Sequence, residues 1–191
     1  MEDNILIKKI CDGDSPAIRF LVEKHKNLVW HIIISMTGHH NYAEDLFQEV
    51  FLRVFKGIRN FRAESSLSTW VGSITHHVCV DFIRNRKKEA GLLSLDEDRK
   101  LAANIRPDPD WKQAENSDMN RLILATIAKL PADYRTAITL FHLDEKSYEE
   151  IAEITAMPLG TVKSNISRGR NLLRKLLISN VPDLAAILDN F

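Results

Sequence analysis

The stretch SYEEIAEITAMPLGTVKSNISRGRNLLRKLL, residues 147–177, carries two helical patterns that are separated by an interruption at residues 157–160. Ser147 and Glu150 have the spacing of a capping box, in which each side chain accepts a hydrogen bond from the other residue's free backbone amide. Pro158 disfavours a helix at Met157 but suits the first turn of a new helix. The stretch therefore predicts two helices joined by a tight turn.

The second of these helices has an apolar stripe that includes Val162 and Ile166, and its other faces carry polar and basic side chains but no acid. A helix that follows a tight turn and presents such side chains suits the major groove of DNA. The alternative is a solvated basic face on a core helix, but the turn and the capping box favour contact with DNA. The candidate DNA-contact residues are Lys163, Ser164, Asn165, Ser167, Arg168 and Arg170.

Upstream of this pair, apolar residues recur at helical spacing, and no segment shows sustained strand-like alternation. The pattern fails between residues 89 and 117, where Gly91, Pro107 and Pro109 occur and acidic side chains outnumber basic ones. We therefore predict an all-α fold of two small helical domains, with a helix-turn-helix in the second. The predicted boundaries are 1–88 and 118–180 for the domains, 89–117 for a flexible acidic linker and 181–191 for a tail.

The composition is that of a globular protein, with 45% apolar and 27% charged residues among 191 and a net charge of zero. The acidic linker offsets two basic clusters, residues 84–88 and 163–175, that contain no acid. No apolar run reaches the length of a membrane span, and the first residues do not resemble a signal peptide. We expect a cytoplasmic protein without membrane insertion, cofactor or metal.

Residues 130–177 resemble the fourth conserved region of bacterial sigma factors of the extracytoplasmic-function group, from the leading Leu-Pro through Ser-Tyr-Glu-Glu-Ile-Ala to Gly-Thr-Val-Lys-Ser. Residues 43–88, AEDLFQEVFLRVFKGIRNF followed by RAESSLSTWVGSITHHVCVDFIRNRKK, are similar to the second conserved region. Three positions depart from the usual pattern of the fourth region. Ala156 replaces a glycine, Asn165 an arginine and Gly169 an alanine, which bears on the exact promoter sequence.

The resemblance implies a non-catalytic subunit that gives RNA polymerase its promoter specificity. The second domain would read the minus-thirty-five element as duplex through the six residues named above, and the first would hold the minus-ten element as melted strand. The implied partners are promoter DNA, core polymerase through its largest-subunit clamp helices and its flap, and an anti-sigma factor. The rival interpretations are an autonomous helix-turn-helix regulator of the LuxR type and, much less favoured because no catalytic motif occurs, a nucleic-acid enzyme.

Asp45, Gln48 and Glu49 lie on one helical face, for which spacing alone favours a solvated acidic surface. The resemblance instead implies that this face docks on the clamp helices. Melted strands need cationic and aromatic or polar side chains. Trp70 also falls on an apolar stripe, so core packing competes with base stacking there. The candidate polymerase-binding residues are Asp45, Gln48, Glu49 and Phe55, and the candidate minus-ten residues are Arg62, Ser65, Ser66, Trp70, His76, His77, Arg84, Arg86 and Lys87.

Overall fold

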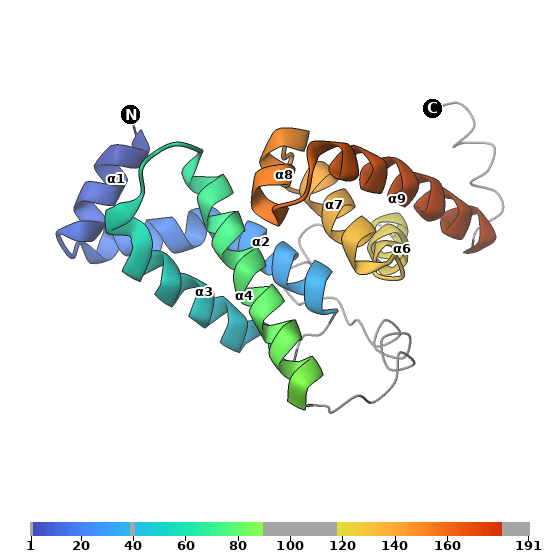
Figure 1. Cartoon of the computed structure of the whole chain (residues 1–191), viewed down its shortest axis with the longest axis horizontal. Helices are drawn as coiled ribbons and strands as arrows, with labels where there is room; N and C mark the ends of the chain where they lie inside the picture. The colour runs from blue at the N-terminus through green and yellow to red at the C-terminus, as the bar shows by residue number, and fades with distance from the viewer. Residues whose placement is uncertain (1, 39–40, 90–117, 181–191) are drawn as a thin grey trace.

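The computed structural model describes residues 2–38, 41–89 and 118–180, and every regular element in these ranges is helical (Figure 1). The all-α prediction is therefore confirmed. The predicted linker, apart from residue 89, and the predicted tail lie outside the described residues. The elements are α1 (Glu2–Cys11), α2 (Ser15–Thr37), α3 (Ala43–Gly57), the 3-10 turn η1 (Ile58–Asn60), α4 (Leu67–Glu89), α6 (Asp118–Ile127), α7 (Ala132–His142), α8 (Tyr148–Thr155) and α9 (Leu159–Asn180).

Helix α2 begins and ends at residues whose chemistry favours these positions. The Asp14 carboxylate accepts a hydrogen bond of 3.2 Å from the Ala17 amide, and Pro16 lies in the first turn. At the other end Gly38 adopts the left-handed conformation with φ 69°, and its amide donates to the Ile34 carbonyl at 3.0 Å. These two caps set the length of the helix that supports the N-terminal half.

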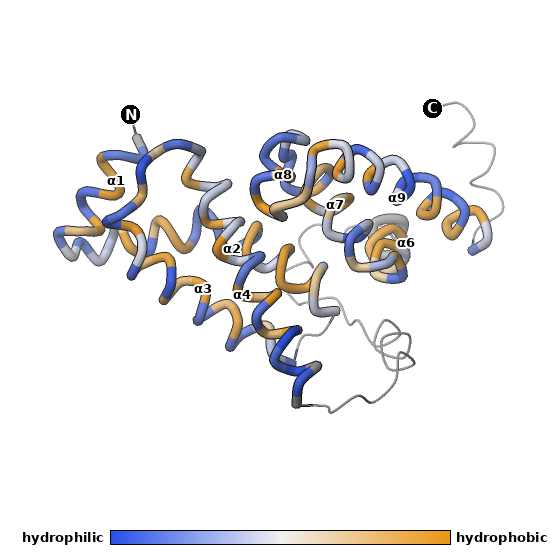
Figure 2. Tube along the Cα trace, in the orientation of Figure 1, coloured by the Kyte–Doolittle hydropathy of each residue, from blue (hydrophilic) through white to orange (hydrophobic). Residues whose placement is uncertain are grey.

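Helices α3 and α4 pack against α2 and against each other. Val29 of α2, Val50 and Val54 of α3, and Val71 of α4 are completely shielded from solvent. Figure 2 shows the corresponding alternation along these helices, with hydrophobic segments between hydrophilic ones. The N-terminal half is thus a bundle whose core lies among these three helices, with α1 packed beside α2.

The capping box predicted for α8 is present. The Ser147 hydroxyl accepts from the Glu150 amide at 3.1 Å, and the Glu150 carboxylate accepts from the Ser147 amide at 3.0 Å. Helix α8 ends at Ala156, which holds the left-handed conformation with φ 54°, and α9 begins directly after Pro158. The predicted helix-turn-helix is therefore confirmed, although its turn carries an alanine in a conformation that favours glycine.

Helix α9 lies very close to α7 at Gly169. A Cβ atom at this position would stand 2.8 Å from Ile138 Cγ1 and 3.4 Å from Tyr134 Cβ, both on α7. Only a residue without a side chain fits this approach unless Ile138 moves. Gly169 thereby fixes the orientation in which α9 presents its outer face.

The two halves of the chain are in direct contact, with α7 against α2 and α8 against α4 (Figure 1). Arg135 of α7 is only 8% exposed, and its guanidinium donates to the Ser35 carbonyl in the last turn of α2 and to Ala128 O. A Cβ atom on Gly72 of α4 would stand 2.9 Å from Ile154 Cδ1 of α8. The buried apolar residues of both halves consequently form one continuous cluster.

Candidate nucleic-acid interface

The outer face of α9 is polar and basic along its whole length, and the helix contains no acidic residue. Helix α7 supports the opposite face, where Val162 and Ile166 are buried. The Ser164 hydroxyl donates to the Gly160 carbonyl at 2.9 Å, so its oxygen remains able to accept from a base edge. The exposed residues on this face include Lys163, Ser164, Ser167, Arg168 and Arg170.

Asn165 differs from the other five candidates, because it is 7% exposed. Its side-chain amide donates to Met157 Sδ at 3.6 Å. Successive residues of an α-helix are 100° apart around its axis, so Asn165 shares the inner side of α9 with the buried Val162 and Ile166. The structure therefore places Asn165 in the packing of the turn and apart from the exposed DNA-contact candidates.

Arg170 is held in place by α7. Its Cζ atom lies 4.9 Å from the centroid of the Phe141 ring, and its Nε donates to His142 Nε2 at 3.1 Å. Tyr148 stacks on Phe141 with ring centroids 5.0 Å apart. Burial, followed by the charge of Arg170, lowers the pKa of His142. Sequence reasoning missed Phe141 and His142, since nothing in the spacing between residues 141 and 170 indicates contact.

The predicted polymerase-binding face on α3 is only partly free. Asp45 and Gln48 are exposed, whereas the Glu49 carboxylate accepts from Arg53 Nε at 2.7 Å. Arg53 also reaches Asp81 of α4 at 3.2 Å, and hydrogen bonds to these two carboxylates raise the pKa of Arg53. Phe55 packs as a half-buried side chain against the core.

The loop before α4 positions three of the predicted minus-ten residues. Arg62 is exposed, with 4.0 Å between its guanidinium and the Glu64 carboxylate. Ser65 is half-buried. The Ser66 hydroxyl accepts from the Thr69 amide at 3.0 Å, so Ser66 acts as the cap of α4.

Trp70 packs inside the N-terminal half. Its ring centroid lies 5.2 Å from that of Phe61, and a Cβ on Gly57 would meet Trp70 Cζ2 at 3.3 Å. The side chain is half-buried. These contacts favour the core-packing alternative for Trp70 in this conformation.

The adjacent histidines of α4 differ in environment. His77 is exposed, and its Nδ1 lies 2.7 Å from the Ser73 carbonyl, which accepts the Nδ1 proton. His76 is half-buried, and its Nδ1 is shielded from solvent with no partner among the described residues. Burial, followed by the charge of His77, lowers the pKa of His76. His77 is consequently the more accessible of the two.

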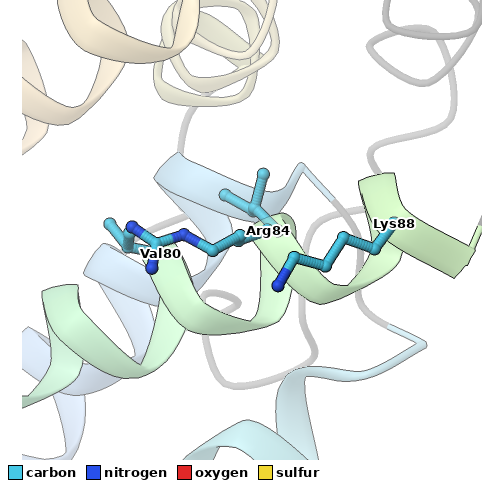
Figure 3. A pocket seen from close by; sticks show the side chains of 4 residues that line it. Val80, Arg84 and Lys88 are labelled. Carbon is cyan, nitrogen blue, oxygen red and sulfur yellow. The ribbon is translucent and has the colours of Figure 1, made fainter. Parts of the chain in front are cut away.

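The end of α4 combines basic and aromatic side chains. The Arg86 guanidinium lies 4.8 Å from the Tyr42 ring centroid and 5.9 Å from that of Phe82. Arg84 and Lys88 lie one turn apart and line an open groove with Val80 and Ile83 (Figure 3). The side chain of Lys87 lies outside the described part of the structure. Arg84 and Arg86 are both exposed at this end of the predicted minus-ten surface.

The beginning of α4, by contrast, is occupied by the second half of the chain. Thr69 Oγ1 donates to Glu150 Oε1 at 3.0 Å, and the Lys146 ammonium donates to Ser68 Oγ at 2.8 Å. The Ser73 hydroxyl donates to the carbonyl of a residue in α8 at 3.3 Å. The first turns of α4, which adjoin the predicted minus-ten residues Ser66 and Trp70, are therefore in contact with α8 and the residues that lead into it.

Two family models match the chain. Sigma-70 region 2 matches residues 21–89, and sigma-70 region 4 matches residues 120–173. The ECF RNA polymerase sigma factor SigW of Bacillus subtilis is 35% identical over 179 residues, which cover 90% of this chain and 94% of the relative. The ECF RNA polymerase sigma-E factor of Haemophilus influenzae is 32% identical, with coverage of 91% and 94%.

Two solved structures have a similar fold. The sigma factor RpoE from Bartonella quintana, in complex with the anti-sigma factor NepR, has a TM-score of 0.66 and 27% identity, and covers 83% of this chain and 95% of its own. CnrH in complex with the cytosolic domain of CnrY shares the fold, with a TM-score of 0.63 and 20% identity, and covers 93% of this chain and 97% of its own.

The fold, the helix-turn-helix and the two family models define a sigma-70-type subunit of the transcription machinery, a class that binds core RNA polymerase and is not enzymatic. Within that class, the chain belongs to the extracytoplasmic-function family of RNA polymerase sigma factors. None of the described helices has both the length and the apolar character needed to cross a membrane. Among the described side chains, no three metal-ligating groups gather into a site.

Proposed function

We propose that this sigma factor directs core RNA polymerase to promoters whose minus-thirty-five element is read as duplex by the outer face of α9. The observation that carries the proposal is the acid-free, exposed face with Lys163, Ser167 and Arg168 on the second helix of a helix-turn-helix. Serine hydroxyls donate to and accept from base edges, and arginine and lysine bind guanine or phosphate. Asn165 supports the turn rather than reading a base.

The first half of the chain would hold the minus-ten element as melted strand. Arg62 and His77 are exposed near the beginning and middle of the α4 region, and Arg84 and Arg86 are exposed at its end. Such cationic side chains follow a single-strand backbone, while neighbouring aromatic rings offer surfaces for stacking. The exposed Tyr42 ring would offer one such surface once Arg86, which lies 4.8 Å from its centroid, turns towards the strand backbone.

Docking on the clamp helices of the largest polymerase subunit is proposed for α3, with Asp45 and Gln48 as the direct contacts. Both side chains are exposed, and neither forms a hydrogen bond or ion pair with the described residues that would have to break before they meet a partner. Glu49 would contribute only after leaving Arg53 or together with it, because the two form a hydrogen bond of 2.7 Å. Contact with the polymerase flap is proposed for the second half of the chain.

Promoter binding in this proposal requires the two halves to separate. Thr69 and Ser68 bond to Glu150 and Lys146, and α4 cannot meet a melted strand along its beginning while α8 occupies it. Core polymerase would stabilise the separated form by binding each half at a different place. An anti-sigma factor is a further proposed partner, because the structural relative RpoE was solved in complex with one.

The proposal is tested by run-off transcription with purified core polymerase on fragments of the genome that encodes the chain. We expect specific transcripts with the wild type, and strongly reduced transcription with Asp45→Ala and with Arg168→Ala. Matched controls are Asp12→Ala and Arg19→Ala, because both residues are exposed and lie outside the proposed surfaces. Unchanged transcription from both test variants would refute the residue assignments.

A binding experiment separates this proposal from an autonomous helix-turn-helix regulator. Addition of core polymerase should convert weak binding of a promoter fragment into specific binding that decreases steeply with salt. Equally tight and specific binding by the free chain, on a palindromic site, would favour the autonomous regulator instead.

A further inference from the structure

Two α7 side chains, Phe141 and His142, surround the guanidinium of Arg170. The Phe141 ring lies beneath the guanidinium at 4.9 Å, and His142 Nε2 accepts from Arg170 Nε at 3.1 Å. Tyr148, half-buried at the beginning of α8, stacks on the Phe141 ring with ring planes 22° apart. Helix α7, supported by Tyr148 of α8, therefore fixes the position of one exposed arginine of α9.

In this arrangement the terminal N–H groups of Arg170 stay available to bind a ligand. An arginine has five N–H groups, and His142 takes the one on Nε, so the Nη1 and Nη2 groups at the tip of the fork remain. For its Nε2 to accept, His142 must be neutral and carry its proton on Nδ1. The ring is partly shielded at its α9 side although the residue as a whole is exposed, and this partial burial, followed by the charge of Arg170, lowers the pKa of His142 and favours the neutral form.

The position of Arg170 on α9 indicates what these donors meet. Successive residues of an α-helix are 100° apart around its axis. On this basis Arg170 lies at the border of the exposed face, on the side of α7, whereas Ser164 and Ser167 lie nearer the middle of that face. When a recognition helix enters the major groove, the middle of its outer face meets base edges and its borders meet the phosphates that flank the groove. This border position favours a phosphate over a base as the partner of Arg170.

We propose that His142, together with the Phe141 ring, is a positioning residue that holds Arg170 ready to bind a phosphate of the upstream promoter element. This inference rests on the proposed function of α9. A flexible arginine loses side-chain freedom when it binds, and that loss weakens binding by about two- to tenfold for one such side chain. His142 reduces this loss in advance, while the charge that attracts the phosphate remains on Arg170.

The test uses the full chain with core polymerase and a labelled fragment that the run-off experiment identifies as a promoter. Affinity is measured over a series of salt concentrations for the wild type, His142→Ala, His142→Gln, Arg170→Ala and the double variant His142→Ala/Arg170→Ala. His142 is exposed, so its substitution should leave the fold intact, and thermal unfolding checks this.

Four results are expected together. His142→Ala weakens binding about two- to tenfold with an unchanged salt slope, because the charge on Arg170 remains. His142→Gln, whose side-chain oxygen accepts in place of Nε2, restores most of the affinity. Arg170→Ala reduces the salt slope by about 0.9, as expected for one lost phosphate contact. The double variant binds like Arg170→Ala alone, because His142 acts only through Arg170.

The experiment distinguishes a failure of the proposed function from a failure of the positioning role of His142. If the wild-type complex binds no fragment specifically, the proposed function fails, and the role of His142 fails with it. If the wild-type complex binds specifically but His142→Ala has no effect, or has the same effect with and without Arg170, then only the positioning role is overturned.

Discussion

The hydroxyl of Thr69 donates a hydrogen bond of 3.0 Å to the carboxylate of Glu150, although the two residues lie 81 positions apart and belong to different conserved regions of the family. The same carboxylate closes the capping box with the Ser147 amide. Burial disfavours the charged form of Glu150, but the hydrogen bonds from Ser147 and Thr69 lower its pKa overall. One side chain thus both starts α8 and attaches it to α4.

Loss of the Thr69 hydroxyl should weaken this attachment without disturbing the cap. In Thr69→Val the shape of the side chain is kept, but the hydroxyl loses its bond to Glu150 and its 2.8 Å hydrogen bond with the Ser66 hydroxyl. We expect the free energy of unfolding to fall by about 1 kcal/mol for each bond lost. Thr69→Ser keeps the hydroxyl and serves as the control. Urea unfolding of both variants measures the difference, and equal stability of the two would contradict a contribution from these bonds.

Because α9 lies very close to α7, we expect even the added methyl group of Gly169→Ala to lower the free energy of unfolding. Gly169→Ala gains helix propensity of about 1 kcal/mol, but its Cβ would stand 2.8 Å from Ile138 Cγ1. Because Ile138 is fully buried, we expect overpacking to prevail, with a net loss of about 1 kcal/mol.

A double-variant cycle with Ile138→Ala checks this prediction, since the shortened side chain makes room for the new Cβ. Gly169→Ala should then be neutral or stabilising in the Ile138→Ala background. A loss of the same size in both backgrounds would show that the cost has another origin.

The sequence predicted the elements well because their signals are local. The Ser147–Glu150 box and the break at Pro158 each depend on residues within one helical turn, and both appear in the structure. The apolar periodicity of α2, α3 and α4 likewise required no knowledge of their partners.

The contacts between distant segments could not be predicted in the same way. Nothing in the sequence near Thr69 or Arg170 indicates that Glu150 or His142 will lie beside it. The burial of Asn165 could not be predicted either, although it lies within a single helix. An asparagine is usually exposed, and only the packing around the turn shows that this one is buried. Its burial against Met157 follows from how the turn closes.

Acid should destabilise the protein through His25 of α2. This side chain is 3% exposed and its Nε2 has no partner among the described residues. Burial, then the charge of Lys24, lowers its pKa from 6.5 to about 4, with Asp3 opposing the shift and Lys146 adding to it. The unfolded chain therefore binds the proton more readily, and stability declines as pH falls from 6.5 towards 4, by up to about 3 kcal/mol.

The His25→Leu variant isolates this contribution, because leucine fills a similar volume and does not titrate. Urea midpoints at pH 7 and pH 5 should differ more for the wild type than for the variant, since the other titrating groups are shared. Parallel behaviour of the two proteins would show that His25 is accessible to protons in the folded state.

Arg135 should couple the unfolding of the two halves, because it crosses between them and no carboxylate of the described residues pairs with it. Its guanidinium donates to the Ser35 carbonyl of α2 and, at 2.7 Å, to the Ala128 carbonyl after α6. In Arg135→Met both carbonyls lose this donor, and we expect a loss of about 2 kcal/mol in the free energy of unfolding. Arg135→Lys can satisfy only one of these carbonyls, so its stability should lie between those of the wild type and Arg135→Met.

If the guanidinium links the halves, urea transitions followed by tryptophan fluorescence and by far-UV circular dichroism should coincide in the wild type and separate in Arg135→Met. Transitions that still coincide in the methionine variant, at unchanged stability, would show that the apolar contact between α4 and α8 is sufficient to join the halves.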